Sequence, residues 1–252
     1  MSISLLRFYA ELNDFLPSER KQVPFVHEFS GRSSVKDVIE SLGVPHTEVD
    51  LILVNGESVD FSCQVGNGDR ISVYPVFESI DISPVLRVRP RPLRTTKFVV
   101  DIHLGRLAAY LRMLGFDTFY EREATDEMLA RLSSRESRIL LTRDRGLLKR
   151  SLVTHGYCVR ENLPRRQLVE VICRFDLQRS VRPFRRCLQC NGLLELVPKH
   201  TILERLPPAI RQGHDEFRQC VSCRKVYWPG SHYQKMKALC ESLLDLQGGK
   251  IP

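Results

Sequence analysis

The sequence predicts a mixed α/β protein built in three parts, and three observations support this. Residues 97–180 alternate apolar runs of strand length with helical stripes, a pattern typical of a mainly parallel sheet with right-handed crossovers. A Pro- and Arg-rich stretch at 83–96 reads as a stiff linker and separates this part from residues 1–82. Two CxxC pairs lie in residues 181–252, where we expect a zinc-bound unit and a C-terminal helix.

The first part, residues 1–82, has strand patterns around a single helix. Val35, Val38, Ile39 and Leu42 recur at helical spacing behind a serine cap, and two turn signals separate the later strands. The expected elements, in order, are strands at Ile3–Tyr9 and Val23–Phe29, a helix at Ser33–Leu42, a strand at Leu51–Val54 followed by the turn Asn55-Gly56, and a strand at Arg70–Val76 after the turn Gly66–Asp69.

The second part, residues 97–180, alternates between short apolar runs typical of strands and apolar residues at helical spacing. Gly115 supplies a C-terminal stop for its first helix, and Thr125 or Asp126 caps its second. The expected elements are strand Lys97–Val100, a helix over 104–114, strand Phe116–Tyr120, a helix through Met128, Leu129 and Leu132, strand Arg138–Thr142, helix Gly146–His155, strand Tyr157–Arg160 and helix Pro164–Phe175.

Composition and charge bound the functional class. The chain is 42% apolar and 27% charged, which is ordinary for soluble globular proteins, and no stretch approaches the length of a membrane span. The N-terminus lacks the features of a signal peptide, so we expect a cytoplasmic protein whose cysteines stay reduced. The net charge of +8 is uneven: residues 1–82 carry −7, 83–193 carry +12 and 194–252 carry +3. Such a basic surface favours a polyanion, most commonly nucleic acid, although a solvated surface without a partner remains the alternative.

Three aspartates stand where a parallel α/β sheet collects its ligands. Asp101 closes the first strand of the second part, Asp144 lies just beyond the strand ending at Thr142, and Asp126 starts the intervening helix. Ligands of open α/β sheets sit outside the carboxyl ends of the strands. Carboxylates gathered in a basic module repel one another unless a cation is present, and Mg²⁺ or Mn²⁺ is the natural one for phosphodiester chemistry.

Each of these residues also has a structural interpretation. Asp126 and Asp144 could be helix N-caps, and Asp101 a turn residue. Thr142 could orient Asp144 or a water molecule, or simply be a hydroxyl at the end of a strand. The neighbouring arginines would hold the backbone of a nucleic acid; they are Arg106, Arg112, Arg143, Arg145 and Arg150.

The most specific local signal is the pair of CxxC motifs. Cys187 and Cys190 form the first, and Cys220 and Cys223 form the second after an interval of 29 residues. Two residues between thiolates let both face one cation, and four thiolates complete the shell of structural Zn²⁺. The interval exceeds that of a compact ribbon, so we expect an extended hairpin or loop between the motifs; a dithiol redox pair is the weaker alternative.

An aromatic and basic stretch follows the second motif. Trp228 could stack on a base and His232 could contact phosphate, while packing of Trp228 against the cysteine motif is the structural alternative.

Four motifs occur in order along the chain: Phe98–Asp117, Arg138–Leu147, Cys187-x-x-Cys190-Asn191-Gly192, and Cys220-x-x-Cys223 continuing to His232. Together they resemble the Mut-seven C-terminal RNase family, which is similar to PIN-type nucleases with an added zinc ribbon. The resemblance covers about residues 97–240. By this resemblance Asp101, Asp126 and Asp144 match acidic metal-binding positions, and Thr142 matches a small hydroxyl residue before the last of them. Glu161 is the only stand-in for a fourth acidic position.

Residues 1–80 resemble the ubiquitin-like β-grasp module that accompanies this family. Phe8–Leu12, Val54-Asn55-Gly56 and Gly68–Val76 carry the likeness. Sulfur-carrier relatives of such modules need a free C-terminal Gly-Gly, whereas this module continues into the linker, so we expect a docking or regulatory unit instead.

The resemblance implies a metal-dependent ribonuclease that uses Mg²⁺ or Mn²⁺ at the three aspartates and whose zinc ribbon aids RNA binding. The alternative is a non-catalytic RNA-binding adaptor that recruits a protein partner through the acidic β-grasp module.

Overall fold

The structure is a computed structural model that describes residues 1–75, 87–88, 96–230, 233–234 and 236–238. Most of the linker expected at 83–96 and most of the C-terminal helix expected in 181–252 lie outside the described residues. The chain forms two compact units, residues 1–103 with 123–160 and residues 104–122 with 161–252.

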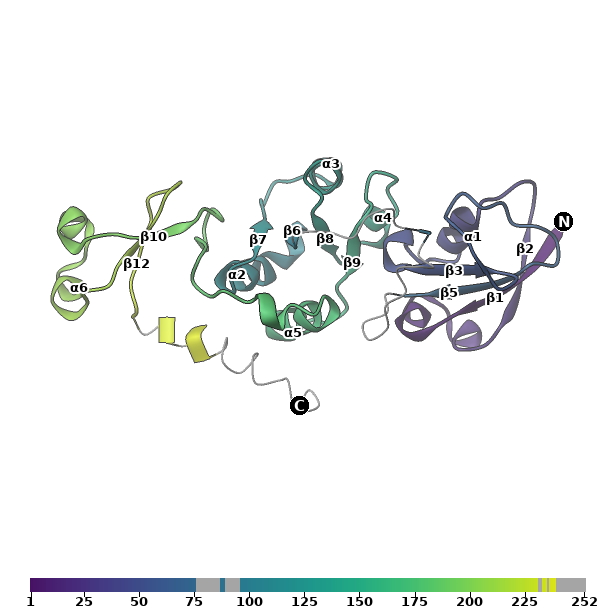
Figure 1. Cartoon of the computed structure of the whole chain (residues 1–252), viewed down its shortest axis with the longest axis horizontal. Helices are drawn as coiled ribbons and strands as arrows, with labels where there is room; N and C mark the ends of the chain where they lie inside the picture. The colour runs from purple at the N-terminus through teal and green to yellow at the C-terminus, as the bar shows by residue number, and fades with distance from the viewer. Residues whose placement is uncertain (76–86, 89–95, 231–232, 235, 239–252) are drawn as a thin grey trace. The chain divides into compact units, whose positions relative to one another are not determined.

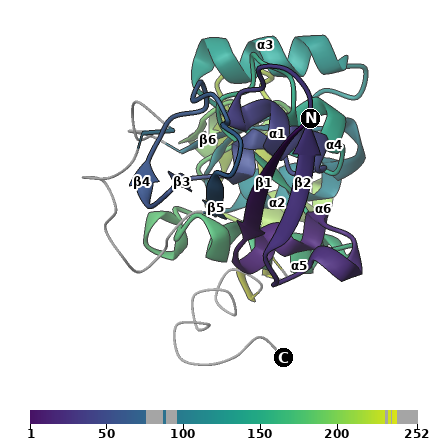
Figure 2. The ribbon, with the colours of Figure 1, turned by 90° about the vertical axis from the view of Figure 1, so that its right-hand side faces the viewer.

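The N-terminal module of the first unit is a five-stranded sheet in the order β2-β1-β5-β3-β4, with helix α1 (Figure 1). The two central strands β1 and β5 pair in parallel, and β2 and β3 pair antiparallel to them; β1 and β2 lie side by side in Figure 2. This is a ubiquitin-like β-grasp topology, as the sequence predicts. The elements are β1 (Ser2–Phe8), β2 (Phe25–Phe29), α1 (Val35–Ser41), β3 (Leu51–Val54), β4 (Glu57–Ser58) and β5 (Arg70–Tyr74).

Local sequence explains the boundaries of this module. Ser34 caps α1 by accepting a hydrogen bond from the Asp37 main-chain N–H, and the Asp37 carboxylate accepts one from Ser34 in return, which is a capping box. The Asn55-Gly56 turn joins β3 to β4 with both residues at positive φ, 53° and 91°. That conformation suits a tight hairpin and strongly favours Asn-Gly. Leu6 and Phe8 of β1 and Ile39 of α1 are fully buried and belong to the core of this module.

The first unit also holds three neighbouring strands of a second sheet, which pair in parallel. Strands β6 (Lys97–Val100), β8 (Ile139–Thr142) and β9 (Gly156–Cys158) are all in parallel, and every residue of β8 is buried. Helix α3 (Asp126–Glu136) buries Leu129, Ala130 and Leu132 and leaves Met128 exposed. Thr125 is its N-cap, which settles the open choice between Thr125 and Asp126. The sheet forms as expected from the run of apolar residues.

One predicted helix is wrong in length. Instead of running over Gly146–His155, α4 spans only Arg145–Leu148, and residues 149–155 form turns. The reason is that Leu147 and Leu148 supply the buried face within a single turn, after which the chain reverses to enter β9 at Gly156. A Cβ at Gly156 would lie 2.6 Å from Leu148 Cδ2, so the chain packs closely against Leu148 at this point.

Buried polar contacts attach the β-grasp module to β9 within this unit. Glu48 is fully buried; its carboxylate accepts a hydrogen bond from the Cys158 main-chain N–H and lies 3.3 Å from the Arg160 guanidinium. His46 bridges the Glu40 carboxylate at 2.6 Å and the Val153 carbonyl at 2.7 Å. A buried carboxylate destabilises a fold unless it is paired and hydrogen-bonded. The contacts from Cys158 and Arg160 therefore compensate the burial of the Glu48 carboxylate.

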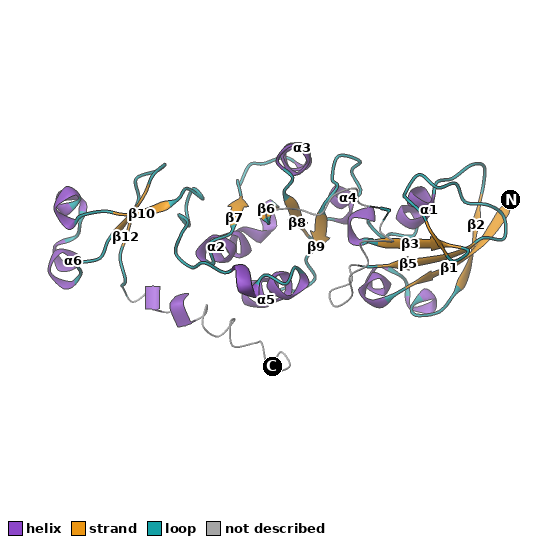
Figure 3. Ribbon diagram, viewed as in Figure 1, coloured by secondary structure: helices purple, strands orange, loops and turns teal. Residues whose placement is uncertain are grey.

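The second unit joins two helices to a cysteine-rich sheet. Helices α2 (Gly105–Met113) and α5 (Pro164–Arg174) pack together, and strand β7 (Asp117–Phe119) follows α2 after Gly115, whose φ of 95° ends the helix as predicted (Figure 3). The main-chain carbonyl of Arg182 lies so close to Gly115 that a Cβ there would be 2.1 Å away.

The segment between the two CxxC motifs forms an extended hairpin, as expected, because β10 (Leu194–Leu196) and β11 (Arg218–Cys220) pair antiparallel at its two ends; the helical turns in its connection were not expected. Together with β12 (Val226–Tyr227) these strands form the ribbon sheet, and short helical turns and α6 (Pro208–Gly213) lie between β10 and β11. Ile202, Leu206 and Phe217 bury a small core of their own there. This core explains why the interval is longer than in a compact ribbon.

Among the described residues, no helix has the length and apolar character needed to cross a membrane. Of the cysteines outside the two CxxC motifs, Cys158 is buried, Cys63 and Cys173 are half-buried, and Cys240 lies outside the described residues.

Candidate active site and metal centre

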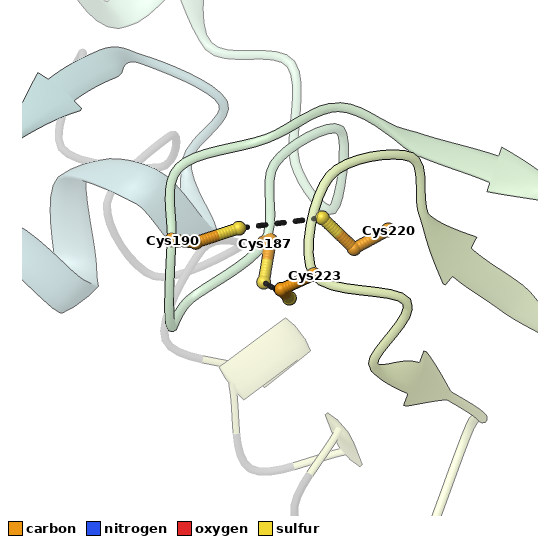
Figure 4. A group of neighbouring side chains, drawn as sticks. All are labelled: Cys187, Cys190, Cys220 and Cys223. Atoms are coloured by element: carbon orange, nitrogen blue, oxygen red, sulfur yellow. Dashed lines mark hydrogen bonds between the residues drawn. The ribbon is translucent and has the colours of Figure 1, made fainter.

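The four predicted cysteines meet at one point (Figure 4). Their sulfur atoms all lie within 4.8 Å of one another, with Cys187 Sγ 3.5 Å from Cys223 Sγ and Cys190 Sγ 3.4 Å from Cys220 Sγ. A disulfide needs about 2.05 Å, whereas a tetrahedral Zn²⁺ with bonds of about 2.3 Å places its sulfurs about 3.8 Å apart. The spacing therefore suits four thiolates around a metal such as zinc.

The two CxxC motifs have the same backbone. In the first, the N–H of Asn191 donates to the Cys187 carbonyl and the N–H of Cys187 donates to the Gly192 carbonyl. In the second, Arg224, Cys220 and Lys225 repeat the pattern with N–H to carbonyl distances of 3.0 and 2.9 Å. Asn191 and Arg224 occupy equivalent positions at φ of 68° and 61°. Two matched knuckles of this kind point their cysteines at a common centre.

The electrostatics of the cluster also call for a cation. Burial opposes ionisation of Cys187, but hydrogen bonds, led by the one from the Tyr227 hydroxyl, lower its pKa to about 7. Burial and contact with the neighbouring sulfurs raise the pKa of Cys190, and raise that of Cys223 to about 12. Ionisation of one cysteine therefore disfavours ionisation of its neighbours. A divalent metal that binds all four sulfurs offsets the repulsion between the thiolates.

Arg112 connects the first knuckle to helix α2. Its side chain is buried, and it donates to the main-chain carbonyls of Thr118 at 2.9 Å, Leu188 at 3.0 Å and Gln189 at 2.9 Å. Burial lowers its pKa, partly offset by the cysteines nearby. We expected Arg112 to contact RNA. Its guanidinium instead donates to buried carbonyls and holds the cysteine knuckle in position.

Trp228 packs against the small core of Ile202, Leu206 and Phe217 and remains half-exposed. Its structural alternative was packing against the cysteine motif, so the neighbour is different from the one considered. His232 lies outside the described residues. The Tyr227 hydroxyl lies 3.1 Å from Cys187 Sγ and accepts a hydrogen bond from the Leu188 N–H, also at 3.1 Å.

Asp101 and Asp144 follow two neighbouring strands and are joined through Thr142. The Asp101 N–H bonds the Leu141 carbonyl, which extends the pairing of β6 with β8 to the aspartate. The Thr142 hydroxyl donates to Asp101 Oδ2 at 2.5 Å and accepts from the Asp144 N–H at 2.9 Å. Thr142 is fully buried and Asp101 is 5% exposed, so this hydroxyl fixes two carboxylate-bearing residues at the carboxyl ends of the strands.

Asp144 and Asp126 have further local roles. Asp144 is the N-cap of α4, because its Oδ1 accepts from the Gly146 N–H at 2.7 Å and the Leu147 N–H at 3.4 Å. Asp126 opens α3 and lies 3.9 Å from the Arg150 guanidinium, which also bonds Glu127 at 2.8 Å. Asp144 is therefore a helix N-cap, which is the structural interpretation given above. Both capping hydrogen bonds use Oδ1, so Oδ2 takes no part in the cap.

His103 joins this set although sequence reasoning did not select it. Its Nδ1 lies 3.3 Å from Asp101 Oδ1, and its side chain is largely exposed. The signal was its position two residues after Asp101. Within the described part of the chain, the four cysteines are the only group of three or more His, Cys, Asp or Glu residues whose ligand atoms all lie within 4.8 Å of one another. The three aspartates are not held that closely, and Glu161 joins no such group.

Comparison with models of known protein families shows the family to which the chain belongs. The model described as the Mut7-C RNAse domain matches residues 96–240, more than half of the chain. The chain belongs to the Mut7-C RNAse domain family. The Mut7-C ubiquitin model matches residues 1–81, in agreement with the β-grasp topology. The family affiliation supports a nuclease or RNA-related role.

Two solved structures are similar to the β-grasp part of this Mut7-C protein. One is described as H. volcanii small archaeal modifier protein 1, with 16% identity and a TM-score of 0.25, covering 30% of this chain and 98% of that one. The other, SAMP1 from Haloferax volcanii, has 15% identity and a TM-score of 0.25, covering 31% and 100%. No curated protein sequence matches the chain.

Three of the remaining arginines predicted to contact RNA are exposed in the Mut7-C domain, and Arg150 is half-buried. Arg106 and Arg143 have exposed side chains. Arg145 is also exposed, and its guanidinium lies 4.9 Å from the centre of the Phe15 ring in the β-grasp module. Such a cation-π contact orients Arg145 while leaving its N–H donors available.

Proposed function

We propose that this chain is a cytoplasmic, metal-dependent ribonuclease with a PIN-like catalytic domain. The single observation that carries the proposal is the buried Thr142 hydroxyl, which joins Asp101 and Asp144 at the ends of adjacent parallel strands. Asp126, at the start of α3, is the third carboxylate of the proposed site.

The donor set fits Mg²⁺ or Mn²⁺, because carboxylate oxygens are the ligands that these hard cations prefer. Such an ion supplies an activated water molecule and stabilises the charge that develops on a phosphodiester. Asp101, Asp126 and Asp144 would hold it. Thr142 positions Asp101 by donating to Oδ2 and positions Asp144 by accepting from its N–H.

The basic surface supports RNA as the substrate. Residues 83–193 carry a net charge of +12, and Arg106, Arg143 and Arg145 remain exposed. Contacts from these cations to phosphates add affinity that depends on salt and not on sequence. In this proposal the zinc ribbon stabilises the fold and extends the RNA-binding surface.

Cleavage of RNA by the purified chain, with Mn²⁺ or with EDTA, tests the proposal. We expect shortened products with Mn²⁺ and none with EDTA. Asp144→Asn should abolish cleavage, since asparagine can still cap α4 but lacks the charge. Asp215→Asn, at an almost fully exposed position, is the matched control and should cut like the wild type. Equal cleavage by Asp144→Asn would refute the assignment.

A non-catalytic adaptor is the second candidate, favoured by the observation that the three carboxylates are not drawn together within 4.8 Å. In that case the acidic β-grasp module, with its net charge of −7, would recruit a protein partner while the basic part holds RNA. The adaptor should bind RNA equally well with and without Mn²⁺ and release no shortened product.

A further inference from the structure

A cleft in the second unit lies beside the zinc ribbon and is separate from the aspartates. Its volume is about 740 Å³, within the range of about 300–1,000 Å³ typical of ligand sites. It lies between the end of α2 at Met113, the segment 183–186, the ribbon sheet and α6. We call it the ribbon cleft; the residues that define it here are Phe184, Arg218, Lys225, Tyr227, Trp228 and Tyr233.

Aromatic side chains line the ribbon cleft without being buried. Phe184, Tyr227, Trp228 and Tyr233 are all half-exposed, and the rings of Phe184 and Tyr233 are 4.2 Å apart. Half-exposed aromatic rings in a concave site offer faces on which a planar base can stack.

The backbone holds two of these rings in place. Phe184 has a φ of 59°, a conformation unusual for phenylalanine, and its N–H donates to the Met113 carbonyl at 2.9 Å. Trp228 is fixed from behind by the core of Ile202, Leu206 and Phe217. Both rings are therefore oriented before anything binds, which lowers the cost of ordering them on binding.

The charge of the lining is positive. Arg186, Arg218 and Lys225 contribute cations, and Glu216 is the one carboxylate that lines the cleft among the described residues. Arg186 is held by Asp117 at 3.3 Å, but Arg218 approaches Glu216 only at 3.8 Å and Lys225 is exposed. Two cations next to aromatic faces match a phosphate next to a base better than they match an apolar peptide.

We propose that the ribbon cleft binds unpaired nucleotides of single-stranded RNA, with bases stacked on the aromatic rings and phosphates at Lys225 and Arg218. This inference rests on the proposed function for its choice of RNA, and it names the part of the substrate that the ribbon recognises. A double-stranded RNA presents stacked, paired bases and has no free base to offer the cleft.

Binding of a short fluorescent oligouridylate to the full chain, followed by anisotropy over a range of salt concentrations, tests the proposal. The Asp144→Asn background prevents cleavage during the measurement. Lys225→Ala should weaken binding and reduce the slope of log affinity against log salt by about 0.7, the value for one phosphate contact on a single strand. Lys199→Ala, a ribbon lysine that does not line the cleft, is the matched control and should leave the slope unchanged.

Phe184→Leu tests the stacking separately from the charge. It should weaken binding by at least about fivefold, which corresponds to a loss of about 1 kcal/mol of stacking, and leave the salt slope unchanged. Retention of zinc by each variant shows that the ribbon is folded. Parental affinity and slope in both variants, or equal affinity for duplex RNA, would overturn the proposal. If the wild type does not cleave RNA but these variants lose binding, the proposed ribonuclease activity is refuted while RNA binding by the ribbon cleft is supported.

Discussion

At the scale of single residues, the cysteine centre requires a residue without a side chain at position 192. An added Cβ at Gly192 would lie 2.8 Å from Cys220 Sγ and 2.7 Å from Ser222 Oγ. Real Cβ atoms do not approach neighbours so closely, so the second knuckle must move to admit one. CxxC spacing alone predicted the four ligands, but the need for glycine here appears only when the two knuckles are brought together.

Gly192→Ala should therefore lose zinc more readily than the wild type. Gly213→Ala is the matched control, because nothing lies within 4 Å of the Cβ that it would add. Competition for zinc against a chromogenic chelator measures the difference. We expect about a tenfold or greater loss of zinc affinity in Gly192→Ala, the lower end of the effect of disturbing groups around a metal; equal retention in the two variants would contradict this account.

At the scale of elements, helix α1 provides a pH-dependent prediction. Hydrogen bonds from the Ser34 side chain and main chain lower the pKa of Asp37 below its usual range. The unfolded chain therefore binds a proton at higher pH than the folded chain does, so the stabilisation is complete above about pH 4 and is lost as the pH falls through the lowered pKa. Asp37→Asn should destabilise the module near neutral pH and flatten this part of the pH profile in urea unfolding. An unchanged profile would show that the capping box contributes nothing.

Helix α2 and the first knuckle should be coupled through Arg112. Arg112→Lys keeps the charge but cannot reach the carbonyls of Thr118, Leu188 and Gln189 with one fork of donors. Because unsatisfied buried carbonyls cost about 1–3 kcal/mol each, the variant should unfold at lower denaturant concentration and release zinc sooner. Arg106→Lys, at an exposed position of the same helix, should do neither. Wild-type stability in Arg112→Lys would mean that its hydrogen bonds are dispensable.

Most elements could be predicted from the sequence, and the misses have physical causes. The strands β6 and β8 follow from unbroken apolar runs, and the stop at Gly115 from its need for positive φ. The length of α4 and the helical insertion before β11 could not be predicted, because tertiary packing decides where α4 ends and a separate small core supports the insertion. Arg112 was misread for the same reason: its sequence neighbourhood is basic, while its buried partners come from residues far along the chain.

At the scale of the whole molecule, the β-grasp module should be a fixed part of the first unit, held against β9, and not a tethered accessory. Glu48 is fully buried and lies 3.3 Å from the half-buried Arg160 guanidinium, which also lies 3.2 Å from the Asp14 carboxylate. Glu48→Gln leaves Arg160 with Asp14 as its partner but removes a buried charged acceptor, so it should lower the free energy of unfolding by about 1–3 kcal/mol. The exposed Glu57→Gln is the control. A double-mutant cycle with Arg160→Met should give a clear coupling energy, and simple additivity would contradict docking through this pair.

The topology of the part that carries the aspartates was also predictable, since alternating strands and helices bring Asp101 and Asp144 to the same end of the sheet. Their link through Thr142 was only one of the alternatives, and the approach of His103 to Asp101 was not foreseen, because side-chain rotamers decide both.

Binding of Mn²⁺ to the zinc-loaded chain, followed by electron paramagnetic resonance, tests most directly whether the three aspartates hold a divalent cation. The account predicts that wild type and Asp215→Asn bind Mn²⁺ with the same affinity, and that Asp101→Asn and Asp144→Asn each weaken it by at least about tenfold while keeping their zinc. Wild-type Mn²⁺ affinity in both aspartate variants would contradict the account.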